Sequence, residues 1–431
     1  MNTTQQYDPN FLLRSLLRLV SEMDWWLLSV TAFLVTIGLA TLAHTQLGIS
    51  FYDKQIAFVW AGLVFLIICW RVPYFVWTQK AVVPILYGIN LGLLLAVMLK
   101  GHTALGAQRW LAIGPITLQP SELAKPVVIF TLAAWLGRRP IRSFFDCFKA
   151  LALIVPPALL VFKQPDLGTS LTFGAIYLGM CFWAGATATD ILVLLSPLLS
   201  LIFNALNVQW WVVYLLVLGV VLLFTWRPRD WSWLIRIAMV LVVLVGNAGL
   251  GEVRPHLWGM LKDYQQKRLT SFLNPYADPR GSGYHILQSL IAIGSGGVTG
   301  QGLGKGNQSQ GAFIPERQTD FIFSVIGEEL GFKISALIVA AYAIICLRAL
   351  KIAYQAREEP VGSLIAIGLM SMFLFHVFLN IGMTMGIMPV AGVPLPFLSY
   401  GGTALLVDLS AIGILQSIRF LNPPPRQDVW R

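Results

Sequence analysis

The chain has 431 residues, of which 57% are hydrophobic and only 12% are charged. An ordinary soluble domain carries about 25% charged residues, so the composition excludes a soluble globular protein. The formal net charge of +10 could indicate nucleic-acid binding. Most Lys and Arg residues, however, flank apolar runs in short loops, where membrane topology explains them. We therefore expect a membrane protein with no nucleic-acid partner.

Twelve apolar runs of helical length follow one another along the chain. Because backbone polar groups have to pair inside lipid, each run is expected to form a transmembrane helix. The fold class is thus an all-α, polytopic membrane protein, with residues 1–431 forming one domain. The expected spans are 25–45, 55–75, 81–99, 121–137, 147–163, 167–185, 188–205, 209–225, 232–250, 319–348, 361–383 and 396–419.

Basic residues gather in alternate loops, which indicates the orientation of the chain. Cations near helix ends are retained preferentially in the cytoplasm, so these loops are expected inside. The two termini, 1–24 and 420–431, fall on the same side, in agreement with an even number of crossings. Residues 251–318 then form one large extracytoplasmic loop. The cytoplasmic cations are Arg71, Lys80, Arg138, Arg139, Arg142, Lys149, Arg227, Arg229, Arg236, Arg348, Lys351 and Arg357.

Within this expected loop, the carboxylate of Asp263 lies between the cations Lys262 and Arg268. Nearby cations favour an ionised carboxylate, which can accept a proton or bind a cation, while the cations can hold phosphates. A solvated charged helix is an equally good interpretation. The glycine-rich stretch 294–306 lacks the spacing of a phosphate-binding P-loop, so it predicts a flexible connection or a close backbone approach.

Several ionisable residues lie at or inside the expected membrane helices. Ionisable groups there are functional hypotheses by default, with a paired structural role as the alternative. Glu122 and Lys125 share a helix face at i, i+3, so a structural ion pair is equally consistent with the sequence. For Asp408 a local hydrogen bond and a functional role both remain open. The other members at or near the outer helix ends are Arg109, Asp166, Glu316, Arg317, Asp320, Glu328 and Glu329.

Histidine and cysteine spacings do not support a metal centre. None of the five histidines forms an HExxH or comparable motif, and none of the four cysteines belongs to a CxxC pair, so a zinc site is not indicated. His285 and His376 are expected to be structural.

The motifs, taken in order, resemble the SEDS family (shape, elongation, division and sporulation), and its RodA branch in particular. Residues 308–310 and Arg317 are more similar to the elongation branch than to the division branch, FtsW. The matching motifs are residues 106–110, 119–122, 164–170, 263–265, 274–275, 283–285, 291–297, 315–323 and 392–402.

The resemblance implies a peptidoglycan glycosyltransferase that joins lipid II into glycan strands outside the bacterial cytoplasmic membrane. Asp263 matches the family's catalytic aspartate, expected to act as general base. The substrate-binding set comprises candidate cations for the pyrophosphates (Arg109, Lys125, Lys262 and Arg268), supporting carboxylates or cation ligands (Glu122, Asp166 and Glu316), and the neighbouring Arg317 and Asp320. A divalent cation, Mg²⁺ or Mn²⁺, is the one cofactor candidate, but no ligand spacing identifies its site.

The resemblance also implies partners: a class B penicillin-binding transpeptidase, other membrane proteins of the elongation machinery, and the growing glycan strand. One feature departs from the family's ten helices. Between the helix that the motif at 164–170 opens and Asp263, three apolar runs stand where the family has one, so residues 188–226 are predicted to add a helix pair. A lipid II flippase and a non-catalytic scaffold are the rival functions. The long outer loop and the lack of internal repeats favour the enzyme.

Overall fold

The computed structural model describes residues 23–44, 49–104, 107–113, 116–226, 232–260, 263–279, 281 and 283–423. Within these residues, ten helices are long and apolar enough to cross a membrane, which confirms the all-α, multi-pass fold class. Each predicted span contains a helix, but α6 and α8 have only 17 residues each. Twelve crossings therefore stay a prediction.

The elements have the following bounds. The long helices are α2 (Trp25–His44), α3 (Ile49–Arg71), α5 (Val82–Lys100), α6 (Pro120–Leu136), α7 (Phe144–Lys163), α8 (Leu167–Trp183), α9 (Ala188–Leu206), α10 (Val208–Thr225), α11 (Trp233–Met260), α15 (Ile322–Gln355), α16 (Pro360–Thr384) and α17 (Gly402–Leu421). The short elements are α4 (Tyr74–Trp77), β1 (His102–Ala104), β2 (Ala107–Ile113), β3 (Ile116–Leu118), α12 (Asp263–Leu273), η1 (Pro275–Ala277), α13 (Tyr284–Gly296) and α14 (Asn307–Gln310).

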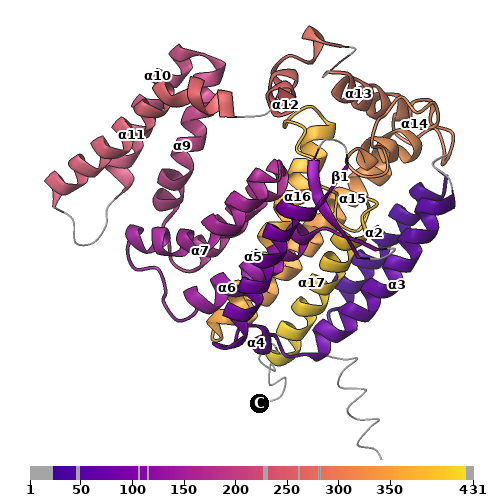
Figure 1. Ribbon diagram of the computed structural model, residues 1–431, viewed down its shortest axis with the longest axis horizontal. Helices are drawn as coiled ribbons and strands as arrows, with labels where there is room; N and C mark the ends of the chain where they lie inside the picture. The colour runs from indigo at the N-terminus through magenta and orange to yellow at the C-terminus, as the bar shows by residue number, and fades with distance from the viewer. Residues whose placement is uncertain are drawn as a thin grey trace, which may run out of the picture.

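The centre of the molecule is a bundle in which α16 packs against α15, α8 and α6, and α17 packs along α3. The large apolar core lies between these helices, while many outward-facing apolar side chains stay exposed, for example Leu99 and Val245. Such exposure fits a protein whose surroundings are lipid. The short helices α12, α13 and α14 lie together at one end of the bundle, hereafter the loop end (Figure 1).

Helices α9, α10 and α11 form a three-helix unit of their own. They pack mainly on one another around a small core that includes Leu222 and Trp226. The Trp226 ring packs edge-on against the Phe144 ring of α7, with 5.1 Å between their centroids, and this contact attaches the unit to the bundle. Figure 1 shows this unit extending away from the central bundle. Whether α9 and α10 are additional to a ten-helix core remains a prediction.

Helix α15 is broken at Gly331, where φ is 72° and ψ is −173°. The glycine-rich segment after α13 runs across this break. The backbone N–H of Gly302 donates to the Glu329 carbonyl at 2.9 Å, and the N–H of Phe332 donates to the Gly297 carbonyl at 2.9 Å. The predicted close backbone approach is thus confirmed, because these bonds pair groups that the break would leave unpaired in lipid.

Substitution of Gly300 by alanine is expected to lower the free energy of unfolding by about 2–4 kcal/mol, from a positive φ and overpacking together. Gly300 has a φ of +81°, and an added Cβ would lie 2.2 Å from the Glu329 carbonyl oxygen. Gly294, in the same stretch, has open space at its Cβ, so Gly294→Ala serves as the matched control and should change stability little. Thermal unfolding of the detergent-solubilised protein measures the stability of both variants. Equal losses of stability in Gly300→Ala and Gly294→Ala would contradict the expectation.

The segment 385–401, between α16 and α17, corrects one predicted boundary. The span expected from residue 396 begins as a helix only at Gly402. Pro396 has no N–H, and Phe397 has a φ of 67°, which is incompatible with a helix. Residues 395–399 of this non-helical segment are nevertheless buried. Two of their carbonyls accept hydrogen bonds from side chains: the Tyr342 hydroxyl donates to the Pro396 carbonyl at 2.5 Å, and the Gln55 amide donates to the Ser399 carbonyl at 3.2 Å.

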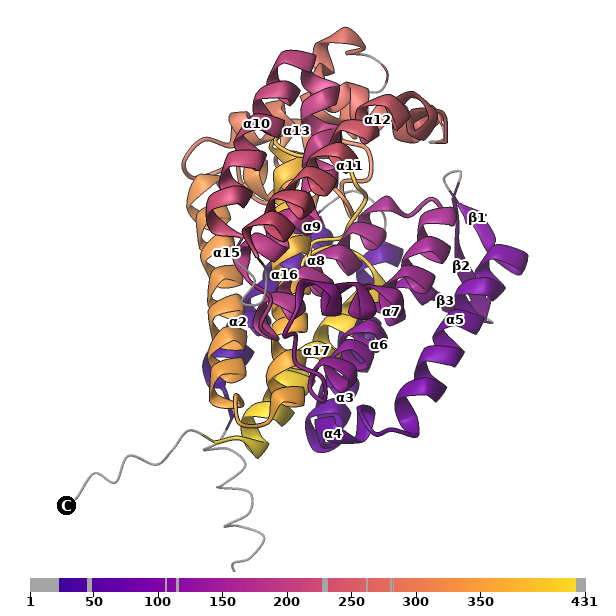
Figure 2. The ribbon, with the colours of Figure 1, turned by 90° about the vertical axis from the view of Figure 1, so that its left-hand side faces the viewer.

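A small antiparallel sheet with strand order β1-β2-β3 was not anticipated by the all-α expectation. Its strands are short, and only β2 exceeds three residues, so no extended alternating pattern announces them. Figure 2 shows the sheet and α5 on the opposite side of the bundle from α15. The sheet matters because β2 carries Arg109.

Candidate active site

Asp166 begins α8 and is almost fully buried, with 1% of its surface exposed. Its carboxylate caps the helix by accepting the backbone N–H of Thr169 at 3.2 Å and the Thr169 hydroxyl at 3.0 Å. The Ser121 hydroxyl, from α6, donates to the same carboxylate at 3.3 Å. The Nη1 atom of Arg109 lies 4.0 Å from the Oδ1 atom of Asp166, and the Arg109 guanidinium donates to the Pro165 carbonyl. Residues from β2, α6 and α8 therefore meet at one point.

Glu122 and Lys125 form an ion pair inside the bundle, with 2.6 Å between the carboxylate oxygen and the ammonium nitrogen. Their side chains are only 3% and 1% exposed. The Lys125 ammonium also lies 3.3 Å from Nε2 of His376 on α16. Asp408 on α17 is within electrostatic range of both, and it accepts a hydrogen bond from the backbone of Phe397. As placed here, Lys125 contacts the protein interior and is not open to a large anion.

Asp320, just before α15, is the centre of a second cluster of charges. Arg268, Glu316, Arg109 and Asp166 all lie within its electrostatic range. Burial raises the pKa of Asp320 to about 6, with Arg268 and Arg109 opposing the shift and the two carboxylates adding to it. This carboxyl group therefore titrates close to neutral pH, and it connects the Arg109–Asp166 pair to helix α12.

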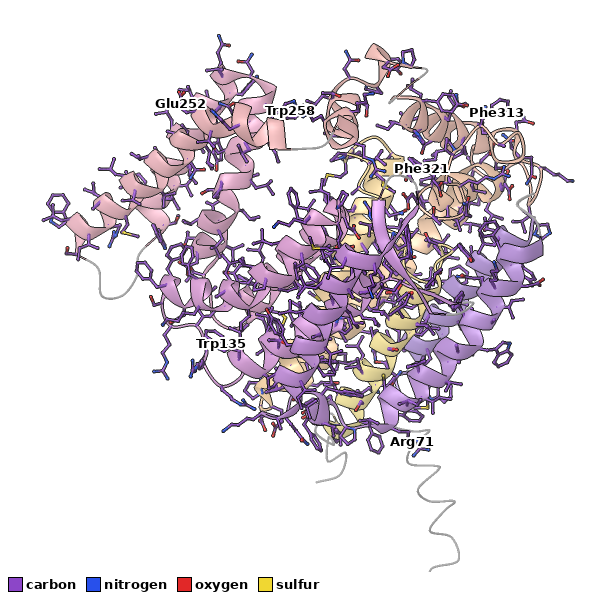
Figure 3. All side chains as sticks on the ribbon, viewed as in Figure 1. Arg71, Trp135, Glu252, Trp258, Phe313 and Phe321 are labelled. Atoms are coloured by element: carbon purple, nitrogen blue, oxygen red, sulfur yellow. The ribbon has the colours of Figure 1, made fainter. Side chains whose placement is uncertain are left out.

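His285 on α13 borders the same cluster, although the sequence indicated only a structural role. Burial lowers its pKa below the ordinary value; Arg268 lowers it further, and Glu316 acts in the opposite direction. The ring stacks on Phe321, with 6.0 Å between centroids and 24° between planes. Figure 3 shows Phe321, the residue after Asp320, beneath α12 and α13 and far from Arg71 at the other end of the bundle.

Asn380 was missed by the sequence reasoning, although an amide inside an apolar helix is a usable signal. It lies one turn after His376 on α16 and is fully buried. Its amide nitrogen donates to the backbone carbonyl of Asp320 at 3.0 Å and to that of Val393 at 2.8 Å. One face of α16 therefore contacts both the Glu122–Lys125 pair and the turn that carries Asp320.

Glu316 and Arg317 point in different directions. The Glu316 carboxylate accepts the Thr319 hydroxyl at 3.2 Å and closes the turn before α15. Arg317 is 5% exposed, and its Nη1 has no hydrogen-bond partner among the described residues. It lies within electrostatic range of Glu329, which accepts the Ser309 hydroxyl at 3.0 Å. Arg317 thus faces the junction of α14 and α15.

Asp263 is the first residue of α12, but its side chain is outside the described part of the structure, and Lys262 lies outside the described residues altogether. Arg268 follows five residues later on the same helix, about 7.5 Å along its axis. The Arg268 Nη1 donates to the Val390 carbonyl at 3.4 Å. Helix α12 therefore carries both Asp263, at its first residue, and Arg268, which belongs to the Asp320 cluster.

A metal centre finds no support in the described residues, where no group of three His, Cys, Asp or Glu side chains is arranged to hold an ion. The candidate Mg²⁺ or Mn²⁺ is therefore not assigned to particular side chains.

The sequence matches a family model along nearly its whole length. The FtsW/RodA/SpoVE model, described as cell cycle protein, matches residues 18–211 and 207–422. The chain belongs to this family. The two matched segments overlap at the junction of α9 and α10, and together they cover nearly all of the described residues.

Named relatives of the FtsW/RodA/SpoVE family agree. The peptidoglycan glycosyltransferase MrdB of Escherichia coli K12 is 39% identical over 394 residues, covering 91% of this chain and 92% of that protein. The peptidoglycan glycosyltransferase RodA of Treponema pallidum is 35% identical over 435 residues, covering 93% and 98%. The predicted RodA-like membership and the predicted activity, glycosyl transfer in peptidoglycan synthesis, are both confirmed.

A solved structure shows the same fold. It is described as the structural coordination of polymerization and crosslinking by a peptidoglycan synthase complex, and it superposes with a TM-score of 0.69 at 27% identity. The match covers 94% of this chain and 99% of that chain. The multi-pass membrane location is thereby confirmed, while the orientation of the termini stays a prediction.

Proposed function

We propose that this RodA-like protein polymerises lipid II into glycan strands during cell elongation, at the extracytoplasmic face of the bacterial cytoplasmic membrane, with Asp263 as general base. The observation that carries the proposal is the position of α12. Its first residue is Asp263, and its Arg268 joins the cluster around Asp320, Arg109 and Asp166. The proposal is supported because the helix that begins with Asp263 also supplies a cation to this cluster.

In the proposed reaction, Asp263 takes the proton from the acceptor sugar hydroxyl as that oxygen attacks the anomeric carbon of the donor. The new glycosidic C–O bond forms while the bond from the anomeric carbon to the pyrophosphate oxygen breaks. The lipid pyrophosphate leaves with the electron pair of that bond. A single displacement inverts the anomeric centre and needs no carboxylate nucleophile.

Cations at the loop end would stabilise the negative charge that develops on the leaving pyrophosphate. Arg109 is one candidate, because it also donates to the Pro165 carbonyl and is not paired with a carboxylate alone; Lys262 is the other, on the family resemblance. Asp166 orders Arg109, at a distance of 4.0 Å. Glu122 and Lys125 are buried in the bundle and would support the site from within the protein. Glu316 closes the turn that leads to Asp320, and Arg317 would anchor this turn toward Glu329.

The partner we propose is a class B penicillin-binding transpeptidase, within an elongation assembly of other membrane proteins. The likeness to a synthase complex that coordinates polymerization and crosslinking supports this. In the proposed orientation, the basic loops and both termini lie in the cytoplasm, which puts α12, α13 and α14 outside, where a crosslinking partner would work.

The test is polymerisation of purified lipid II by the detergent-solubilised protein together with its cognate transpeptidase. Glycan strands are expected. If none form while a known-active polymerase succeeds in parallel, the enzyme is contradicted. The same protein in proteoliposomes then separates the rivals: transbilayer movement of lipid II without polymer would favour the flippase, and neither activity would favour the scaffold.

Polymerisation is expected to decline as the pH falls through about 6, because Asp320 has a pKa of about 6 and protonation removes its attraction for Arg268. With this pKa, the ionised fraction falls from roughly 90% at pH 7 to roughly 10% at pH 5. The pH dependence of folding stability runs in the opposite direction to that of the rate. Because the raised pKa means that the folded state prefers the protonated form of Asp320, the contribution of this group to stability is lost as the pH rises through 6.

Rate profiles between pH 5 and pH 8, with wild type and Asp320→Asn compared, check this prediction. The variant should be slower at pH 7 and should lack the decline near pH 6. If Asp320→Asn has the same pH–rate profile as wild type, the decline belongs to another group. The other charged groups that face Asp320 are Arg268 on α12, Arg109 on β2, Asp166 on α8 and Glu316.

A further inference from the structure

Helix α12 carries the proposed base, yet it has little packing of its own to hold it. Its principal neighbour among the described elements is the three-residue helix η1. A second tether is the Gln266 amide, which donates at 2.8 Å to the carbonyl of Trp258, labelled in Figure 3 near the end of α11. Among the described residues, these two contacts join α12 to η1 and to the end of α11, and a third contact joins it to the central bundle.

Arg268 is the residue of α12 that reaches the bundle. Its Nη1 donates to the Val390 carbonyl at 3.4 Å. A Cβ added to Gly392 would lie 3.5 Å from this Nη1 and 3.3 Å from the Asp320 carboxylate, so both groups border the same glycine. Ser271, one turn further along α12, is 4% exposed. The 268–271 face of the helix therefore points into the protein.

We infer that Asp320 is a positioning residue: its carboxylate holds the Arg268 guanidinium against the bundle and thereby fixes the catalytic helix α12. This inference rests on the proposed function, since it concerns how the base Asp263 is placed. Gly392 allows the approach because it has no side chain between the two charged groups. Asn380 supports the arrangement by donating to the Asp320 backbone carbonyl at 3.0 Å.

The alternative is that Arg268 contacts the substrate pyrophosphate directly. The two roles differ in what an exchange of the two charges would do. If Arg268 and Asp320 act on each other, exchanging the two side chains would restore the attraction between positions 268 and 320, because opposite charges would again face each other. If Arg268 acts on the substrate, the swap replaces a cation on α12 by an anion, which repels the pyrophosphate.

Hydrogen–deuterium exchange of the α12 amides in the full-length protein tests the inference without lipid II. Asp320→Asn and Arg268→Gln are each expected to raise exchange of residues 266–273 at least about fivefold, because local opening free energies are set by such tertiary contacts. Lys267→Gln is the matched control: it removes an exposed cation from the same helix and should leave exchange unchanged. Unchanged exchange in both Asp320→Asn and Arg268→Gln would overturn the inference.

The charge exchange Arg268→Asp with Asp320→Arg gives the second readout. Each single variant should lose at least about tenfold in polymerisation, and the double variant should recover at least half of the lost α12 protection and severalfold in rate, since contacting residues couple non-additively. A double variant no better than the singles would overturn the inference. Asp263→Asn separates this result from the proposed function: it should reduce polymerisation by a factor of roughly 10²–10⁴ while α12 keeps its wild-type exchange.

Discussion

Asp263→Asn is expected to reduce lipid II polymerisation by a factor of roughly 10²–10⁴, the range that a positioned general base contributes. The amide has nearly the size of the carboxylate but cannot accept the proton of the sugar hydroxyl. Asp263 opens α12, where asparagine is also tolerated at a helix start, so the fold should be unaffected. The measurement is the initial rate of glycan-strand formation with the cognate transpeptidase present.

Two controls make the loss interpretable. Abundance and thermal unfolding of Asp263→Asn should match wild type, which excludes misfolding as the cause. Asp263→Glu keeps the carboxylate but extends it by one methylene, so it should retain part of the rate if proton transfer is the role. If Asp263→Asn polymerises lipid II at the wild-type rate, Asp263 is not the general base, and another group has to accept the proton.

Lys125→Met is expected to lower the free energy of unfolding by about 3–5 kcal/mol, the usual cost of leaving one member of a buried ion pair without its partner. The Lys125 ammonium lies 2.6 Å from Glu122, and both side chains are almost fully buried in the bundle. Methionine matches the length of lysine, so the loss reports the charge and not a cavity. Thermal unfolding in detergent measures the change.

The double variant Glu122→Gln with Lys125→Met separates charge from function. With both charges removed, no ion is left unpaired, so most of the lost stability should return. Recovered stability without recovered polymerisation would assign the pair a role in the reaction, whereas recovery of both would make it structural. Lys125→Met as stable as wild type would contradict the ion pair.

Much of the architecture follows from local sequence properties. Apolar runs have to become helices in lipid, because every backbone N–H and C=O needs a partner within its own segment, so the positions of the long helices could be predicted. The breaks could not. Gly331 and Phe397 take non-helical φ values inside or beside apolar runs. The break at Gly331 depends on backbone partners from the segment after α13, and the turn at Phe397 depends on distant side chains such as the Tyr342 hydroxyl.

For the candidate site, the residue types could be predicted, since charged groups at membrane depth are costly and stand out. The sequence also paired Glu122 with Lys125, three residues apart on one helix face. It did not indicate that Asp320 lies among Arg268, Arg109 and Asp166, which come from three other elements. That grouping depends on how α8, β2 and α12 converge.

The sequence by itself determined the lipid environment of the chain, the positions of its long helices and its family. These follow from composition, the length of each apolar run and the order of the motifs, which can all be read along the chain. Only the tertiary structure decided which charged groups from distant segments face one another: Lys125 toward His376, Arg317 toward Glu329, and Arg268 toward Asp320. The physical reason is that electrostatic interactions depend on distance through space and on burial, and neither quantity can be read from separation along the chain.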